Sequence, residues 1–248
     1  MARIFITGSA GGLGRGSAQA LLEDGHEVVV HARSSERLTA LRELLDHGAA
    51  GVVGDLALLD ETRHVAEQVN DLGRMDAVIH NAGVIRGAHV LPVNVIAPYL
   101  LTALLERPER VIYLSSSMHR GGRPSLTGVD WSGRRETRSY SDSKLFVTAL
   151  AAAVARRWTD VLSNAVDPGW VPTKMGGSDA PDDLRLGHVT QVWLATADDR
   201  EALTSGGYWH HQRRRAPAPS VNDERFQTSC WRRWVASRGL RFGRRPMS

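Results

Sequence analysis

Six short apolar runs alternate with segments of helical periodicity, and this alternation leaves few folds open to the chain. The apolar runs are RIFIT (3–7), EVVVH (27–31), AGVVG (50–54), DAVIH (76–80), RVIYLSS (110–116) and LSNAVD (162–167). The helical segments lie near 13–24, 36–46, 59–72, 92–106 and 140–158. Nearly continuous apolar strands separated by helices are typical of a parallel sheet that is covered on both faces. We therefore expect a single α/β domain with a Rossmann-type, doubly wound, mainly parallel β-sheet.

The chain has 248 residues, enough for one sizeable core, and its charge is divided unevenly. Residues 213–248 hold ten arginines against Asp223 and Glu224, a net +8, which leaves residues 1–212 at −4 of the whole-chain +4. We expect residues 1–212 to form the folded domain, with SGGYWH (205–210) as a candidate last edge strand. The Arg/Trp-rich tail has no clean period, so we expect a poorly ordered terminus with little regular structure after about residue 225. A surface on this tail for nucleic acid or an acidic partner is the less favoured alternative.

The residue types argue against a metal site, a disulfide or a membrane span. Cys230 is the only cysteine, and the ten histidines show no spacing typical of metal ligands. The longest uncharged run, 87–105, contains two prolines, a histidine and an asparagine, which favours a buried helix over a membrane helix. The first residues form a strand-like run rather than a charged and then apolar leader. We expect a cytoplasmic protein.

The first strand runs into a glycine-rich turn, TGSAGGLGR, that opens the first helix. Glycines allow the backbone to approach a pyrophosphate, and the helix N-terminus supplies unpaired N–H groups. This context predicts a dinucleotide site, although a glycine-rich turn without a ligand has the same pattern. The second strand ends without the acidic residue that would bind a free ribose 2′-hydroxyl, so Arg33 and Ser34 favour a 2′-phosphate and hence NADP(H). Arg33 as an ordinary surface cation is the alternative.

Further candidate cofactor residues follow the later strands. Asp55 is placed to bind an adenine amino group or only to cap a turn, and Gly83 in HNAGV would permit close approach to a ribose. The loop DPGWVPT (167–173) is placed to hold a nicotinamide carboxamide, although Pro-Gly and Val-Pro are also common turn formers. The residues predicted to contact the cofactor are Gly8, Ser9, Gly12, Leu13, Gly14, Arg33, Ser34, Asp55, Leu56, Asn81, Ala82, Gly83, Tyr140, Lys144, Pro168, Gly169, Val171 and Thr173.

Tyr140 and Lys144 are the strongest candidates for chemistry. The chain has only two lysines, and one of them lies four residues after a tyrosine, on the same face of a predicted helix. Tyrosine is a poor acid or base at its ordinary pKa near 10. An adjacent ammonium favours the tyrosinate, so we expect Lys144 to lower the pKa of Tyr140 towards neutrality. A chance Tyr-x-x-x-Lys pair is the alternative.

With these motifs in order, residues 1–210 resemble the short-chain dehydrogenase/reductase family in its NADP-preferring branch. The resemblance is carried by TGSAGGLG, HNAG, VNVIAPYLLTALL, YLSSS, YSDSK and DPGWVPT. It implies hydride transfer between a nicotinamide and a carbonyl or alcohol carbon, with Tyr140 exchanging the proton. It also implies that Ser116 holds the substrate oxygen, that Lys144 holds the nicotinamide ribose and that Asn94 completes a water relay. Homodimer contacts through 92–106 and 140–158 are expected on the same basis.

The segment between Ser116 and Tyr140 resembles the extended loop of retinol-dehydrogenase-like members. We expect residues 117–139 to form a wall of the substrate site and residues 174–190 to form a lid. The candidate lining residues, each also explained by ordinary packing, are Met118, His119, Trp131, Trp170 and Met175.

Asn94 also carries an expectation from the residues alone. Pro98 lies four positions later and has no N–H for the Asn94 carbonyl, so the helix should be interrupted there and the carbonyl free for another donor. A proline kink that serves packing only is the alternative.

The leading functional interpretation is an NADP-dependent oxidoreductase acting on a small or medium, partly apolar carbonyl compound or alcohol. An NADPH-sensing protein without turnover, a tail-mediated binder of nucleic acid or acidic partners, and an epimerase or dehydratase that recycles its nicotinamide are the alternatives.

Overall fold

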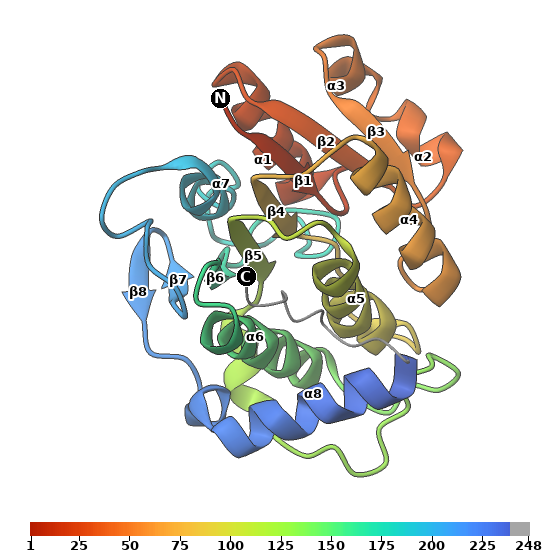
Figure 1. The fold of residues 1–248 in the computed structure, drawn as a ribbon, viewed down its shortest axis with the longest axis vertical. Coiled ribbons are helices and arrows are strands. Elements are labelled where there is room, and N and C mark those ends of the chain that lie inside the picture. The colour runs from red at the N-terminus through yellow and green to blue at the C-terminus, as the bar shows by residue number, and fades with distance from the viewer. Residues whose placement is uncertain (239–248) are drawn as a thin grey trace, which may run out of the picture.

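The computed structural model describes residues 1–238, which form an α/β fold around one eight-stranded sheet (Figure 1). The sheet has the order β3-β2-β1-β4-β5-β6-β7-β8, and each neighbouring pair is parallel except β7 and β8. Its strands are β1 (Arg3–Ile6), β2 (Glu27–Ala32), β3 (Ala50–Val53), β4 (Ala77–His80), β5 (Arg110–Leu114), β6 (Leu162–Asp167), β7 (Tyr208–His210) and β8 (Arg213–Arg215). The predicted doubly wound, mainly parallel sheet is confirmed.

Helices cover both faces of the sheet. Buried side chains of α1, α3 and α7 form one apolar cluster with the sheet, whereas α4 and α5 pack on the opposite face and α6 packs there over β5 and β6 (Figure 1). The α-helices are α1 (Gly12–Glu23), α2 (Ser35–Thr39), α3 (Arg42–Asp46), α4 (Leu59–Asp71), α5 (Ala97–Leu104), α6 (Tyr140–Arg157), α7 (Val189–Thr196) and α8 (Glu224–Arg238). Shorter turns are the π-helix η1 (Pro92–Ile96) and the 3₁₀ helices η2 (Ser117–Gly121) and η3 (Pro219–Asn222).

The edge of the sheet differs from the sequence prediction. The run SGGYWH contains β7, but β8 follows it through a tight turn and takes the edge position. All three residues of β8 are exposed arginines, a charged edge that disfavours pairing with another chain. The predicted helix over 36–46 is divided into α2 and α3.

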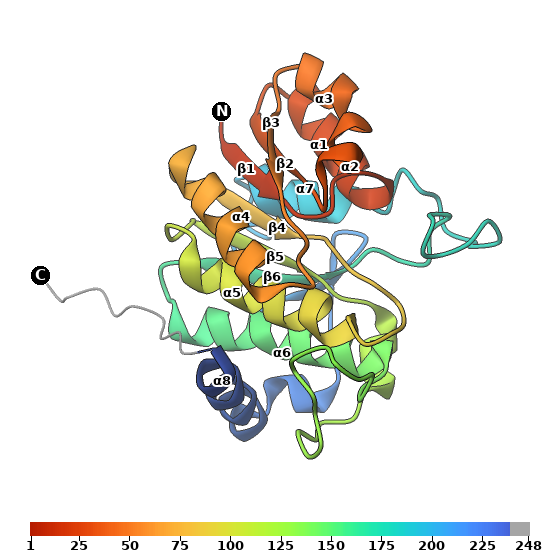
Figure 2. The ribbon, with the colours of Figure 1, turned by 90° about the vertical axis from the view of Figure 1, so that its right-hand side faces the viewer.

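The expectation of little regular structure after about residue 225 is wrong for residues 224–238. These residues form α8, which lies beside α6 in both views of the ribbon (Figures 1 and 2). Phe226, Cys230 and Trp234, spaced four residues apart, are buried against the core, while Arg232 and Arg233 face outward. The sequence pattern was misread because arginines surround this narrow apolar stripe. Residues 239–248 of the predicted tail lie outside the described residues.

The packing of α8 bears on the expected homodimer. Trp231 and Trp234 contact the ring of Tyr99 on α5, with ring centroids 5.7 and 5.6 Å apart. Because α8 also packs along α6, a contact between two copies through α5 and α6 would have to include α8.

The predicted interruption before Pro98 is present. Residues 92–96 form a π turn, in which the Ala97 N–H bonds to the Pro92 carbonyl, before α5 begins. A π turn inside a helix is one known response to a missing backbone donor. The surrounding helix is buried, and no described helix is long and apolar enough to cross a membrane.

Trp234→Ala tests the docking of α8. Its side chain is fully buried, so the substitution should lower the free energy of unfolding by about 3–5 kcal/mol in urea titrations. Arg232→Ala, on the exposed side of the same helix, should change it by less than about 0.5 kcal/mol. Equal, small effects of the two substitutions would show that α8 does not pack on the core in solution.

Candidate active site

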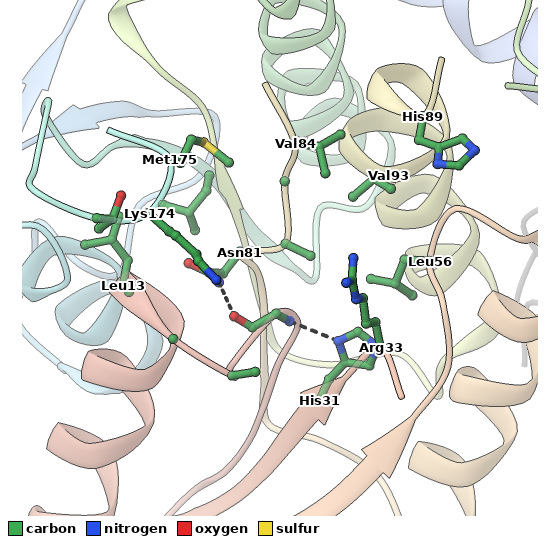
Figure 3. Close-up of a pocket in the computed structure, with 18 of the residues that line it drawn as sticks. Leu13, His31, Arg33, Leu56, Asn81, Val84, His89, Val93, Lys174 and Met175 are labelled. Atoms are coloured by element: carbon green, nitrogen blue, oxygen red, sulfur yellow. Dashed lines mark hydrogen bonds between the residues drawn. The ribbon is translucent and has the colours of Figure 1, made fainter. Parts of the chain in front are cut away.

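A cavity of about 450 Å³ opens at the carboxyl ends of the parallel strands (Figure 3). This edge is where ligands bind in open α/β sheets. The predicted residues that line it are Gly8, Gly12, Leu13, Arg33, Asp55, Leu56, Asn81, Ala82, Gly83, Tyr140, Lys144, Pro168, Thr173 and Met175. Further lining residues that we did not predict include Ala10, Gly11, His31, Arg37, Val84, His89, Val93, Ser115 and Lys174.

The glycine-rich turn is held closely against the loop after β4. Gly8 has φ +68°, and a Cβ there would lie 2.8 Å from the Ala82 Cα. The Asn81 side chain donates to the carbonyls of Thr7 and Gly8 at 2.9 and 3.1 Å. Gly14 does not line the cavity, but a Cβ there would collide with the Asn81 amide. Asn81 therefore fixes the loop after β4 against the glycine-rich turn.

His31 and Ser9 join the turn to the second strand. The Gly8 N–H donates to Nδ1 of His31 at 3.0 Å (Figure 3). The other ring nitrogen, Nε2, donates to the Gly54 carbonyl at 2.8 Å. Burial lowers the pKa of His31, which keeps this ring neutral. Ser9 is fully buried, and its hydroxyl accepts from the His31 N–H. It therefore joins the glycine-rich turn to β2 on the side away from solvent. We did not predict His31, because a histidine inside an apolar strand looks like a core residue.

The end of β2 presents two positive side chains to the cavity. Arg33 and Arg37 both line the cavity, both are exposed, and Figure 3 shows Arg33 extending into it. Ser34 is the N-cap of α2 and accepts from the Arg37 N–H at 3.4 Å, so it places Arg37 one turn beyond Arg33. The start of α1 faces the same cavity, and its N-cap Gly11 makes no side-chain hydrogen bond, so the helix N-terminus is available to an anionic ligand. The i+4 spacing of the two arginines was a signal that we missed.

Asp55 caps a turn at the edge of the cavity. Its carboxylate accepts from the Ala57 N–H at 2.9 Å, as a turn-capping residue does, and the residue also lines the cavity.

The start of α6 determines where Tyr140 lies. Ser139 is its N-cap and accepts from the Asp142 N–H, and the Asp142 carboxylate accepts from the Ser139 N–H, which completes a capping box. Asp142 is 1% exposed and is also paired with Arg123. Because the helix begins at Tyr140, Lys144 follows one turn later on the same face.

Ser116, Tyr140 and Lys144 come together at the end of β5. The Ser116 side chain acts to lower the pKa of the Tyr140 phenol, so the two hydroxyls lie in each other's neighbourhood. The Lys144 ammonium donates to the Leu114 carbonyl at 2.7 Å and lies 5.4 Å from the centroid of the Tyr140 ring. Lys144 is only 4% exposed. Its compact charge is therefore held near the reacting groups, where catalysis would need it.

The pKa of Tyr140 is not lowered in this structure, contrary to our expectation. Burial and the charge of Asp167 raise it to about 12, and the nearby Ser116 side chain only partly opposes them. Burial lowers the pKa of Lys144 to about 8, while Asp167 acts in the opposite direction. Asp167 lies at the end of β6 and is 6% exposed. We did not predict that it lies near Tyr140 and Lys144, because in the sequence it simply precedes a Pro-Gly turn.

Asn94 lies between the loop after β4 and the first turn of α6. Its side chain accepts from the Val84 N–H at 2.8 Å and donates to the Val84 carbonyl at 2.9 Å and to the Ser143 hydroxyl at 3.0 Å. The side chain is 2% exposed. Its bonds to Val84 and Ser143 join the loop after β4 to α6.

The loop after β6 turns back over the glycine-rich turn. A Cβ on Gly12 would lie 3.3 Å from the Thr173 methyl group, and Val171 is buried. Gly169 has φ +84°, and a Cβ there would meet the Asp182 carboxylate that caps the Trp170 N–H. The predicted lid, 174–190, extends from this loop and projects from the body in Figure 2.

The tentative substrate residues lie in different environments. Trp131 is 8% exposed and packs between Phe146 and Trp234 in the core instead of lining the cavity. His119 is fully buried below the surface of the site. Trp170 is 59% exposed and donates to the Gly176 carbonyl, and Met118 is also exposed.

The low pKa of Lys144 is directly measurable, because the chain has only two lysines. In protein labelled with [¹³Cε]lysine, the resonance that disappears in Lys144→Arg should titrate near pH 8, well below its ordinary value near 10.5. Asp167→Asn removes the charge that raises this pKa, so the midpoint should move to a still lower pH. A midpoint that stays at its ordinary value would show that Lys144 is not buried as described.

Comparison with known proteins agrees with this geometry. Residues 2–99 match the family model described as short chain dehydrogenase. The chain is 40% identical over 242 residues to short-chain dehydrogenase chyC of Penicillium rubens, covering 92% of this chain and 93% of that protein. It is 41% identical over 232 residues to short-chain dehydrogenase chry4 of Gibberella zeae, covering 87% and 88%. Human retinol dehydrogenase 13 is more distant, at 27% identity over 92% of this chain and 82% of that protein.

Solved structures support the same fold. A putative uncharacterized protein from Mycobacterium paratuberculosis has a TM-score of 0.78 at 21% identity, covering 98% of this chain and 96% of that one. The Pseudomonas aeruginosa RhlG/NADP active-site complex has a TM-score of 0.67 at 22% identity, covering 84% and 94%. On the extent and identity of the two fungal matches, the chain belongs to the short-chain dehydrogenase family and is an oxidoreductase.

Proposed function

We propose that the protein transfers hydride between NADP(H) and a carbonyl or secondary alcohol, with Tyr140 as the general acid and base. The observation that carries the proposal is the cavity that the glycine-rich turn shares with Tyr140 and Lys144, with the Lys144 ammonium 5.4 Å from the Tyr140 ring and Ser116 nearby. An arrangement of two hydroxyls beside a buried ammonium suits a substrate oxygen that gains or loses a proton.

The chain's own residues would handle the proton and the oxygen. Bound NADP(H) would supply or accept the hydride at its nicotinamide ring. Ser116 would donate a hydrogen bond to the substrate oxygen, and Tyr140 would give that oxygen its proton during reduction. The raised pKa of Tyr140 keeps its phenol protonated at neutral pH, which is the form that reduction needs. The Lys144 charge would then stabilise the phenolate that forms, and Asn94 would support the relay that returns the proton.

The substrate would be a small or medium, partly apolar molecule. Val84, Val93 and Met175 give part of the cavity an apolar lining, and the lid 174–190 carries exposed Leu184 and Leu186. Closure of this segment would exclude water from the reacting atoms.

Replacing Tyr140 with Phe tests the proton transfer. NADPH consumption with a panel of aldehydes and ketones, followed by absorbance, should show kcat reduced by about 10²–10⁴-fold. NADPH binding, measured by fluorescence, should change little, because the phenol ring remains. A variant with wild-type turnover would overturn the assignment of Tyr140.

Arg33→Ala tests the coenzyme preference. Loss of charge-assisted bonds to a 2′-phosphate should raise the KM for NADPH by roughly 10- to 100-fold and leave the KM for NADH nearly unchanged. Arg42→Ala, an exposed arginine on α3, serves as the control for loss of positive charge. Equal increases for the two coenzymes, or a wild-type preference for NADH, would contradict NADP specificity.

A further inference from the structure

His119 joins the loop that carries Ser116 to the C-terminal segment. Its side chain is fully buried, and its Nδ1 lies 2.7 Å from the Ser116 carbonyl oxygen. Its other ring nitrogen, Nε2, accepts from the Ala218 N–H at 2.9 Å. One ring therefore connects positions 99 residues apart in the sequence.

The two partners determine the state of the ring. A backbone N–H can only donate, so Nε2 carries no proton when it bonds to Ala218. The remaining proton is on Nδ1 and is donated to the Ser116 carbonyl. A doubly protonated ring would set two N–H groups against each other at Ala218, and both bonds thus require a neutral imidazole.

The surroundings hold the ring in this orientation. The Tyr208 ring packs against it with centroids 4.6 Å apart, and the Tyr208 hydroxyl donates to the Asp167 carboxylate at 3.0 Å. The charged groups that face the ring oppose each other: Arg120 favours the neutral form and Asp167 the charged form. Burial is the larger effect and lowers the pKa of His119.

The segment that Ala218 belongs to is also anchored farther along. Ala218 leads into η3 and then α8, which packs on α6, the helix that carries Tyr140 and Lys144. Ser116 and Tyr140 are thereby attached to the same C-terminal segment, one through His119 and the other through α6.

We propose that His119 is a positioning residue of the active site, which holds Ser116 beside Tyr140 by bonding the Ser116 carbonyl, while the bond from Ala218 fixes the orientation of the imidazole ring. Its effect on catalysis rests on the proposed function. The C-terminal segment 216–238 is on this view a support for the reacting residues.

Three substitutions separate the two bonds. His119→Asn keeps an N–H donor near the position of Nδ1, His119→Gln keeps an acceptor near the position of Nε2, and His119→Phe keeps the ring shape without either bond. His80→Phe is the matched control, because His80 is likewise buried and bonded, to Thr102, on the fourth strand.

Across these variants, kcat should depend on whether the bond to the Ser116 carbonyl is kept, and not on the free energy of unfolding. We expect His119→Phe and His119→Gln to lower kcat by about tenfold, the worth of one hydrogen bond, with the KM for NADPH little changed. His119→Asn should recover most of kcat even though it loses the bond to Ala218. His80→Phe should lower stability without this loss of kcat. Equal losses of kcat in the Asn and Phe variants would overturn the proposal.

A second measurement does not need turnover. The chain has four tyrosines, so [¹³Cζ]tyrosine labelling gives four resonances, and Tyr140→Phe assigns one of them. Displacement of Ser116 should shift the Tyr140 resonance in His119→Phe and His119→Gln but not in His119→Asn or His80→Phe. In wild-type protein, ¹⁵N spectra should show a Nδ1–H tautomer with a coupling across the hydrogen bond from Ala218 to Nε2. A protonated Nε2, or a Tyr140 resonance unmoved in all variants, would overturn the role of His119 even if no carbonyl substrate were turned over. Absent NADPH oxidation by wild-type protein would instead refute the proposed function.

Discussion

The hydrogen bond from the Lys144 ammonium to the Leu114 carbonyl joins α6 to the end of β5, and the geometry of the reacting residues depends on it. It satisfies a buried cation with a strand-end acceptor, and it fixes how far α6 lies from the strand that leads to Ser116. The capping box at Ser139 and Asp142 then determines which residue begins the helix. These two constraints determine where Tyr140 lies relative to the end of β5.

Burial and charge act against each other at this site. Burial lowers the pKa of Lys144 and raises that of Tyr140, since each charged form loses hydration. The Asp167 carboxylate, held by the Tyr208 hydroxyl, raises the pKa of both groups. A protonated phenol beside a lysine that titrates close to neutrality is suited to donating a proton to a carbonyl oxygen. The lysine and the tyrosine taken alone predict the opposite direction for the pKa of the tyrosine, because burial and Asp167 are not visible in their spacing.

The C-terminal residues show how composition can mislead. Ten arginines among the last 36 positions indicated a solvated tail, yet residues 224–238 are a helix docked through Phe226, Cys230 and Trp234. Long charged side chains leave an apolar stripe intact when they point away from it. The same segment reaches the loop of Ser116 through Ala218 and His119, so residues first expected to be peripheral support the centre of the molecule.

The sheet, the order of its motifs and the spacing of Tyr140 and Lys144 were predictable from the residues alone, because apolar periodicity and helical spacing are local properties. The interruption before Pro98 was predictable too, since a missing N–H is a property of one residue. The folded chain was needed to show that His31 and His119 are neutral connectors, that Asp167 lies near the reacting pair, and that Trp131 belongs to the core. Each of these depends on which groups approach from distant parts of the chain, and burial and long-range hydrogen bonds have no local pattern from which they could be predicted.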